Sequence, residues 1–283
     1  MDLPKILAVV MIVSTMIVGG VQIDLTHAKA TLRNYGLLGR AFVLNFVLLP
    51  LFAVLLVRGF HAGADVSTGI LLMAMAPGVP FLVNSAARTQ GGSLTFALEI
   101  AFLFSAISVV TVPITASLVL GPDALRHMPV QKFLTTLLLF QLVPLLGGAL
   151  IATRLNQQQI EKTAKTFHLA FLVAALALVV ILFPKLLLSI ESVYGWGHLL
   201  IIACIGLFSM AGGWLLGGPD SEYRRTLSIA SLMRNIGLCA LIATSAFKDT
   251  LVAPTIIAYF AITFLMSLPI RSYFRRTKTA PSV

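Results

Sequence analysis

The stretch TLSIASLMRNIGLCALIATSAF, residues 226–247, has the composition of a membrane span with two polar residues, Arg234 and Asn235, near its middle. An unpaired charge at that depth costs at least ~2.5–3.5 kcal/mol. The stretch therefore predicts that another part of the chain stabilises Arg234 inside the membrane.

The composition of the whole chain indicates an integral membrane protein. Of its 283 residues, 58% are hydrophobic and only 11% are charged, whereas a soluble domain carries about a quarter. Long apolar runs alternate with short polar ones, which predicts helical spans and not the alternating strands of a barrel. Cys204 and Cys239 both fall inside apolar runs and form no metal or disulfide motif. We expect no metal site and no nucleic-acid partner, and we assign the net charge of +10 to orientation in the bilayer.

We predict an all-α fold with nine spans, of which two are interrupted. The third span, STGILLMAMAPGVPFLVNSAAR at residues 67–88, carries Pro77, Gly78 and Pro80 in its middle. Proline removes a backbone donor and clashes with the preceding turn, so this helix should break there. In the eighth span a break is expected near Asn235 to Gly237. The predicted spans are 4–22, 37–57, 66–88, 92–119, 132–153, 167–187, 198–217, 225–247 and 251–270.

The basic residues predict how the chain is oriented. Most Lys and Arg residues outside the spans fall in the loops after spans one, three, five and seven and in the tail at 272–283. The positive-inside rule puts that side in the cytoplasm. We therefore expect a multi-pass protein of the cell (inner) membrane, with the N-terminus outside and a basic C-terminal tail in the cytoplasm.

Two charged residues remain in the interior of the predicted spans, away from the span ends: Arg234 and Glu99, the latter in GGSLTFALEIAFLFSA at residues 91–106. Each lies seven to nine residues from the cytoplasmic end of its span, roughly 10–14 Å deep at 1.5 Å per residue. Opposite charges at one depth are most simply partners, so we predict that Glu99 faces Arg234. Such a pair is either a structural lock between helices or part of a substrate or ion site. Further polar groups at similar depth favour a lined cavity beside the broken helices; they are Asn45, Asn84, Ser85, Thr95 and Asn235.

The order of the spans indicates an internal repeat. The third and eighth spans are the interrupted ones, and a long uninterrupted span follows each. Spans one to four then match spans six to nine, in opposite directions through the membrane. We predict an inverted repeat whose first copy lacks one helix.

Four segments resemble the bile acid:sodium symporter family: NFVLLP at 45–50, APG at 76–78, TLSIASLMRNIGL at 226–238, and residues 11–42 before NFVLLP. The resemblance covers almost the whole chain. It implies a panel domain and a core domain, with two broken helices crossing in the core. The panel-like part would be about 1–36 and 130–190, and the core-like part about 37–128 and 196–271.

The resemblance also implies roles for single residues. Asn45 stands where the family has a sodium-binding Gln, and Asn84 with Ser85 falls near a Ser-Asn pair after the first break. Thr95 matches a hydroxyl ligand on the next span, and Glu99 falls where another hydroxyl ligand is expected.

In the eighth span, Met233, Asn235 and Gly237 match the family pattern M-Q-N-x-G. Two positions depart from it: Ala230 replaces the sodium-binding Glu, and Arg234 replaces the Gln. A guanidinium in the sodium pocket would act as a fixed cation and repel sodium. We therefore expect weakened or absent sodium coupling, which leaves Na⁺ or a proton carried by Glu99 as alternative coupling ions.

The function implied is secondary active transport of a small or amphipathic organic anion, by alternating access of core against panel. Relatives carry bile acids, keto acids, pantoate-like acids or sulfur-containing anions, so the family name does not fix the substrate. An enzyme is not expected, because HExxH, GxSxG and paired-Asp motifs are missing and no catalytic residue is predicted. The sequence has no Walker-type GxxxxGK[ST] loop, so we expect neither a nucleotide cofactor nor an ATP-driven pump. The alternative is a non-transporting membrane scaffold with a structural Glu99–Arg234 lock.

Overall fold

The computed structural model describes residues 2–23, 34–78, 91–121, 124, 126, 129–189, 195–248 and 250–278. Apart from one isolated backbone bridge, the regular structure of these ranges is helical. The helices are α1 (Leu3–Val21), α3 (Tyr35–Phe42), π-helix η1 (Val43–Leu48), α4 (Leu49–Gly59), α5 (Ala64–Met75), α7 (Leu94–Val119), α9 (Val130–Leu137), π-helix η2 (Leu138–Leu142), α10 (Val143–Ala152), α11 (Gln157–Ser189), α12 (Gly195–Leu216), α13 (Ser221–Leu232), α14 (Ile236–Ala246) and α15 (Val252–Lys278).

Seven helical segments among the described residues are long and apolar enough to cross a membrane, and each overlaps a predicted uninterrupted span, although α11 begins at Gln157 and not near the predicted 167. Leucines on their outer faces, such as Leu55, Leu118 and Leu215, are exposed, which suits lipid and not water. The chain is therefore an integral, multi-pass membrane protein. The segments are Leu3–Val21, Tyr35–Gly59, Leu94–Val119, Val130–Ala152, Gln157–Pro184, Gly197–Leu216 and Val252–Pro269.

The two spans predicted to be interrupted are interrupted. Helix α5 ends at Met75, and the chain is non-helical from Ala76 to Gly78. Helices α13 and α14 are separated by residues 233–235. The second half of the third predicted span, with Pro80, lies in residues 79–90, outside the described residues. Helix α15 continues to Lys278, well beyond the predicted end of the last span at 270.

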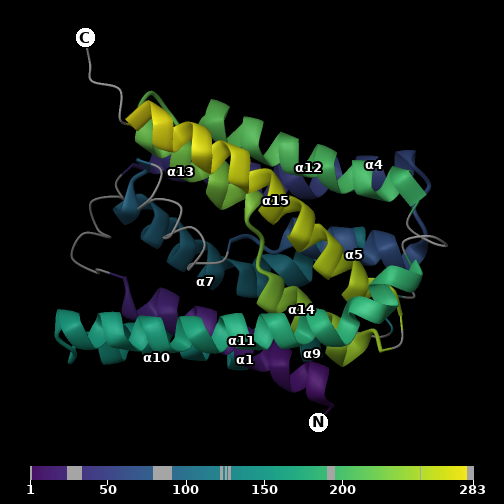
Figure 1. Cartoon of the computed structure of the whole chain (residues 1–283), viewed down its shortest axis with the longest axis horizontal. Coiled ribbons are helices and arrows are strands. Elements are labelled where there is room, and N and C mark those ends of the chain that lie inside the picture. Colours follow the sequence, from purple (N-terminus) through teal and green to yellow (C-terminus); the bar gives the residue numbers. More distant parts are fainter. Residues whose placement is uncertain are drawn as a thin grey trace.

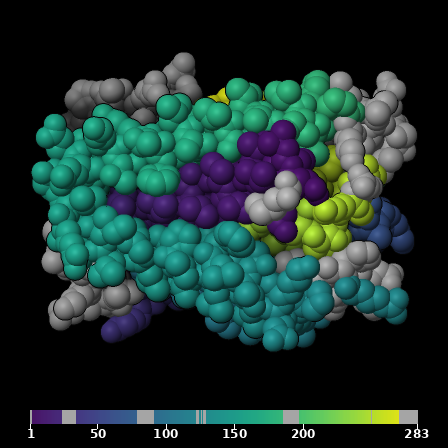
Figure 2. All heavy atoms as spheres, turned by 90° about the horizontal axis from the view of Figure 1, so that it is seen from below, coloured from purple at the N-terminus to yellow at the C-terminus, as the bar shows by residue number. Residues whose placement is uncertain are grey.

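The helices lie in layers (Figure 1). Helix α1 packs along α10 and α11 in one layer, and Figure 2 shows its outer side at the surface between α11 and the α9–α10 segment. On the opposite side of the bundle, α12 packs against α13, α15 and α4. Helices α5, α7 and α14 lie between these two layers in Figure 1, and α14 contacts α1 directly. Helix α5 and α14, the second half of the other interrupted span, are therefore enclosed between the two layers.

Two π-helical turns, which were not predicted from the sequence, interrupt the regular winding of two spans. Both η1 and η2 are followed by a proline in the first turn of the next helix, Pro50 in α4 and Pro144 in α10. A proline inside a helix cannot donate to the carbonyl four residues before it and clashes with that turn. The wider π-turn accommodates this change of register, and such turns are frequent at functional sites.

Close packing of α1 on α10 depends on two facing glycines. A Cβ on Gly20 would lie 2.2 Å from the carbonyl oxygen of Leu145, and one on Gly148 would lie 2.9 Å from that of Ile17. Small residues allow such close backbone approach between membrane helices.

We expect Gly148→Leu to force α10 away from α1 and to destabilise the protein by roughly 1–3 kcal/mol, the usual cost of overpacking. Gly147→Leu is the matched control, because a Cβ at Gly147 meets nothing within 4 Å. Thermal unfolding of the purified variants in detergent micelles measures the difference. Equal midpoints for the two variants would contradict the proposed contact.

Candidate functional site

The two interrupted helices meet at their breaks. Ala76 has extended backbone angles (φ −98°, ψ 90°), and so has Met233 (φ −81°, ψ 116°). Pro77 and Arg234 form an isolated antiparallel bridge, in which the backbone N–H of Asn235 donates to the carbonyl of Ala76 at 3.0 Å. A helix break in a membrane leaves backbone groups that must find partners within the protein. Here each broken segment supplies partners for the other.

The side chain of Arg234 is 1% exposed and lies at this crossing. Its Nε donates to the carbonyl of Met73 at 3.0 Å, and its Nη2 donates to the carbonyl of Ala74. Its Nη1 donates to the carbonyl of Ser231 at 3.4 Å. These carbonyls belong to the last turns of α5 and α13, where helical donors are lacking, although the Met73 carbonyl also accepts from the Ala76 N–H at 3.3 Å. The guanidinium therefore caps the C-terminal ends of both half-helices.

Asn45 on the π-helix η1 completes the set of acceptors around Arg234. Its Oδ1 accepts from Arg234 Nη1 at 2.9 Å, and its backbone carbonyl accepts from Nη2 at 3.5 Å. The Nδ2 of Asn45 donates to the carbonyl of Ala41 and to the hydroxyl of Ser231, both at 3.0 Å. Three helical segments, α3–η1, α5 and α13, are thus joined through one buried cation.

The predicted pairing of Arg234 with Glu99 was wrong. Within the described ranges, every hydrogen-bond partner of Arg234 is a neutral oxygen, and Glu99 is not among them. Glu99 is buried on α7 at 6% exposure, whereas Thr95, one turn earlier, is exposed. The C-terminal end of a helix carries roughly half a negative charge, and two such ends meet at the guanidinium. Their combined partial charges provide the negative charge opposite the guanidinium that the prediction assigned to the Glu99 carboxylate.

Asn235 caps the second half-helix of the interrupted pair. Its Oδ1 accepts from the backbone N–H of Leu238 at 3.1 Å, at the start of α14. Its Nδ2 is buried and has no hydrogen-bond partner in the part of the chain that the structure describes. A buried donor without a partner is costly. The site therefore presents an amide N–H suited to an acceptor group on a ligand.

Gly237 was predicted to lie in the break, but it lies in the first turn of α14. Its role is close packing, since a Cβ there would be 3.0 Å from the backbone nitrogen of Ile12 and 3.2 Å from the carbonyl carbon of Met11 in α1. The break lies at residues 233–235, two residues earlier than predicted, where Arg234 forms the bridge with Pro77 and the Asn235 N–H donates to the Ala76 carbonyl. Met233 is buried at this break. Asn84 and Ser85 lie outside the described residues.

Ser231 and the backbone carbonyls were not predicted as parts of the site, because no residue pattern distinguishes them. A second buried amide was also missed: Gln141 in η2, whose Nε2 donates to the carbonyl of Ser105 and to the hydroxyl of Ser108 at 2.6 Å. A signal for it was present in the sequence, since Gln141 and Asn45 each precede a proline by a few residues within an apolar run.

Apolar spans that enclose two interrupted helices, crossing at their breaks, are typical of secondary transporters with discontinuous helices. The chain belongs to the sodium bile acid symporter family: the model described as "Sodium Bile acid symporter family" matches residues 9–194. The matched region includes Asn45 and α5 but ends before α13, so the position of Arg234 lies outside it.

Two curated relatives illustrate the similarity. The chain is 24% identical over 230 residues to the "Uncharacterized sodium-dependent transporter YocS" of Bacillus subtilis, covering 76% of this chain and 66% of that protein. It is 26% identical over 171 residues to the human "P3 protein", covering 56% of this chain and 34% of that protein. The chain thus spans just under two thirds of the first relative and about one third of the second.

Proposed function

We propose that this protein is a secondary active transporter of a small or amphipathic organic anion. Transport would proceed by alternating access, with the layer of α1, α9, α10 and α11 acting as the panel and the remaining helices as the core. Family membership and the crossing of α5 with α13–α14 support this proposal. The cell membrane, with the N-terminus outside, is the proposed location.

We propose that, at the crossing of the two interrupted helices, Arg234 takes the place that a coupling sodium ion has in a sodium symporter. The single observation that carries it is that the guanidinium of Arg234 binds the carbonyl oxygens of Met73, Ala74 and Asn45. Backbone carbonyls at unwound helix ends are the usual ligands of coupling sodium ions in transporters. A covalently attached cation on these oxygens repels Na⁺ and keeps the positive charge in place through the cycle. Transport by this protein should therefore not require sodium.

The anion-binding side of the site is proposed to be the N-terminus of α14. Half-helix N-termini carry partial positive charge and favour anionic substrate groups. The buried Nδ2 of Asn235 adds a donor at this end, and the charge of Arg234 lies next to it in the chain. A carboxylate or sulfonate oxygen is the acceptor that fits these groups best.

The test is uptake of radiolabelled anions by purified protein in liposomes, with sodium replaced by potassium or choline. Asn235→Ser keeps an N-cap oxygen but removes the amide donor, so we expect uptake at subsaturating anion to fall about 10- to 100-fold, as for a lost hydrogen bond to a charged group. Asn156→Ala is the matched control, because it removes the asparagine cap of Gln159 at an exposed position outside the site.

Two results would sink the proposal. One is uptake that depends on sodium and is abolished by Glu99→Gln; the other is no binding or uptake of any carboxylate, sulfonate or bile acid tried. A proton gradient imposed across sodium-free liposomes separately tests Glu99 as the coupling group. The scaffold alternative loses its main support, since the Glu99–Arg234 lock on which it depended is not formed.

A further inference from the structure

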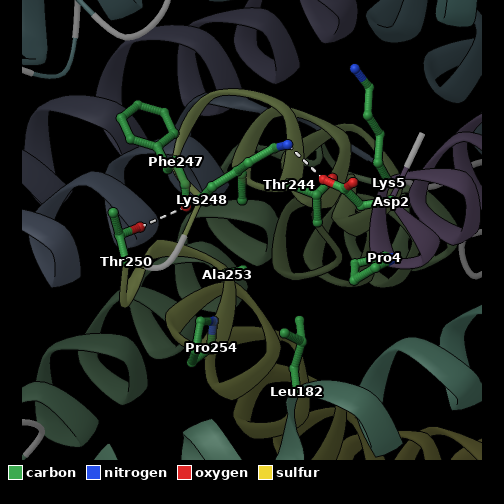
Figure 3. A pocket seen from close by; sticks show the side chains of 11 residues that line it. Asp2, Pro4, Lys5, Leu182, Thr244, Phe247, Lys248, Thr250, Ala253 and Pro254 are labelled. Atoms are coloured by element: carbon green, nitrogen blue, oxygen red, sulfur yellow. Dashed lines mark hydrogen bonds and ion pairs between the residues drawn. The ribbon is translucent and has the colours of Figure 1, made fainter.

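A second polar site lies away from the helix crossing, at the N-terminal end of α1. It is a cavity of about 240 Å³ where α1 and α11 meet the connection between α14 and α15. Figure 3 shows its lining, which combines apolar walls with charged groups at one side. The lining residues that carry the argument are Asp2, Lys5, Leu182, Phe247, Lys248 and Pro254.

Two of the lining residues form an ion pair. The Nζ of Lys248 lies 2.6 Å from the Oδ2 of Asp2, and the two side chains are 60% and 62% exposed. Figure 3 shows the ammonium of Lys5 pointing away from the Asp2 carboxylate. The hydrogen bond and charge of Lys248 lower the pKa of the Asp2 carboxyl, so its charged form persists through the neutral range. The three ionised side chains thus carry a net positive charge.

Helix ends add to this positive potential. The first turn of α1 contributes Pro4 and Lys5 to the lining, and the first turn of α15 contributes Ala253 and Pro254. Both are N-terminal ends, which carry partial positive charge. The cavity therefore favours an anion over a cation.

The ion pair also joins the two parts that must move apart in the proposed transport cycle. Asp2 precedes α1, which packs along α10 and α11. Lys248 lies in the connection between α14 and α15, which is separately held to α5 by a hydrogen bond from the Leu251 N–H to Asp65 Oδ2 at 3.0 Å. Asp2–Lys248 is thus a contact between layers, whereas Asp65–Leu251 lies among the interrupted helices and α15.

We propose that this cavity is an anion-binding vestibule, in which the anionic group of a small organic acid replaces the Asp2 carboxylate on Lys248 and so releases α1 from the α14–α15 connection. The inference rests on the proposed function, because the vestibule would receive the anion that the protein transports. An exposed ion pair contributes little to stability, so a ligand can displace Asp2 at low cost. The cavity is smaller than the ~300–1,000 Å³ of drug-sized ligand sites; it therefore fits a small organic acid better than a whole sterol.

The test measures binding at Lys248 itself. In the full chain, purified in detergent micelles, lysines are ¹³C-dimethylated, which keeps their charge, and Lys248→Arg assigns the Lys248 signal. Potassium pantoate and potassium ethanesulfonate are titrated at constant ionic strength. We expect a saturable shift of the Lys248 signal, and Asp2→Asn should tighten the fitted Kd about two- to fivefold, the strength of an exposed pair. The signal of Lys132, an exposed lysine of α9 outside the cavity, serves as the internal control.

The vestibule is refuted if the Lys248 signal moves no more than the Lys132 signal, or if Asp2→Asn leaves the Kd unchanged. Uptake in liposomes is measured in parallel. A saturable Lys248 response without any uptake supports the vestibule and counts against the proposed transport function. Uptake by the wild-type protein without a Lys248 response supports the proposed transport function and refutes the vestibule.

Discussion

Arg234→Met is expected to destabilise the protein by roughly 3–5 kcal/mol, because it removes the cation that joins the two broken helices. The change removes the guanidinium donors from the buried carbonyls of Met73, Ala74 and Asn45, of which Met73 keeps one bond, from the Ala76 N–H. Each buried polar group left unsatisfied costs about 1–3 kcal/mol. Thermal unfolding in detergent micelles, or unfolding by SDS titration, measures the loss.

Arg40→Met is the matched control for this experiment. Arg40 is exposed on α3, and its Nε donates within its own helix, to the Gly36 carbonyl at 3.1 Å. Substitutions at such positions usually change stability by no more than about 0.5 kcal/mol. If Arg234→Met is no more destabilising than Arg40→Met, the guanidinium does not hold the crossing together.

The second large effect is a gain of function: Ala230→Glu combined with Arg234→Gln is expected to make the protein respond to sodium. Removing the fixed cation frees the carbonyl oxygens of α5 and η1 for a metal ion. Ala230 is buried on α13 one turn before Arg234, so the new carboxylate would restore the acid that the family resemblance expects there. At a sodium concentration about 100 times the Kd, binding adds about 2.7 kcal/mol of stability.

The readout is the unfolding midpoint in sodium chloride against choline chloride at equal ionic strength. The wild-type protein should show no difference, and Arg234→Gln alone should show less than the double variant because it lacks the carboxylate. A sodium response of the wild-type protein as large as that of the double variant would show that Arg234 does not occupy the sodium position.

Much of the fold could be predicted because lipid restricts the chain to apolar helices of known length. Pro77 and Gly78 marked the first break correctly, whereas of the second break, predicted near Asn235 to Gly237, only Asn235 lies within it. The partner of Arg234 could not be predicted in the same way. Side-chain charges are visible in a sequence, but backbone carbonyls are present at every position, and only the fold determines which of them are left without helical donors. Glu99, the other charged residue in the interior of the predicted spans, was therefore predicted as the partner of Arg234.

The π-turns escaped prediction for a related reason. Pro50 and Pro144 predict a local disturbance, but not whether the helix bends, breaks or widens. In η1 the disturbance widens the helix, and it brings both the side chain and the carbonyl of Asn45 to the guanidinium.

The order of residues around Arg234 has a consequence for how the protein is made. Asn45, Met73 and Ala74 all precede Arg234 by at least 160 positions, and synthesis proceeds from the N-terminus. When the segment that contains Arg234 is inserted into the membrane, most of the oxygens that accept its hydrogen bonds have therefore already been synthesised and inserted. These oxygens can then offset the free-energy cost of placing an arginine in the bilayer. If the two halves of the chain were synthesised in the opposite order, Arg234 would enter the bilayer before its acceptors were present.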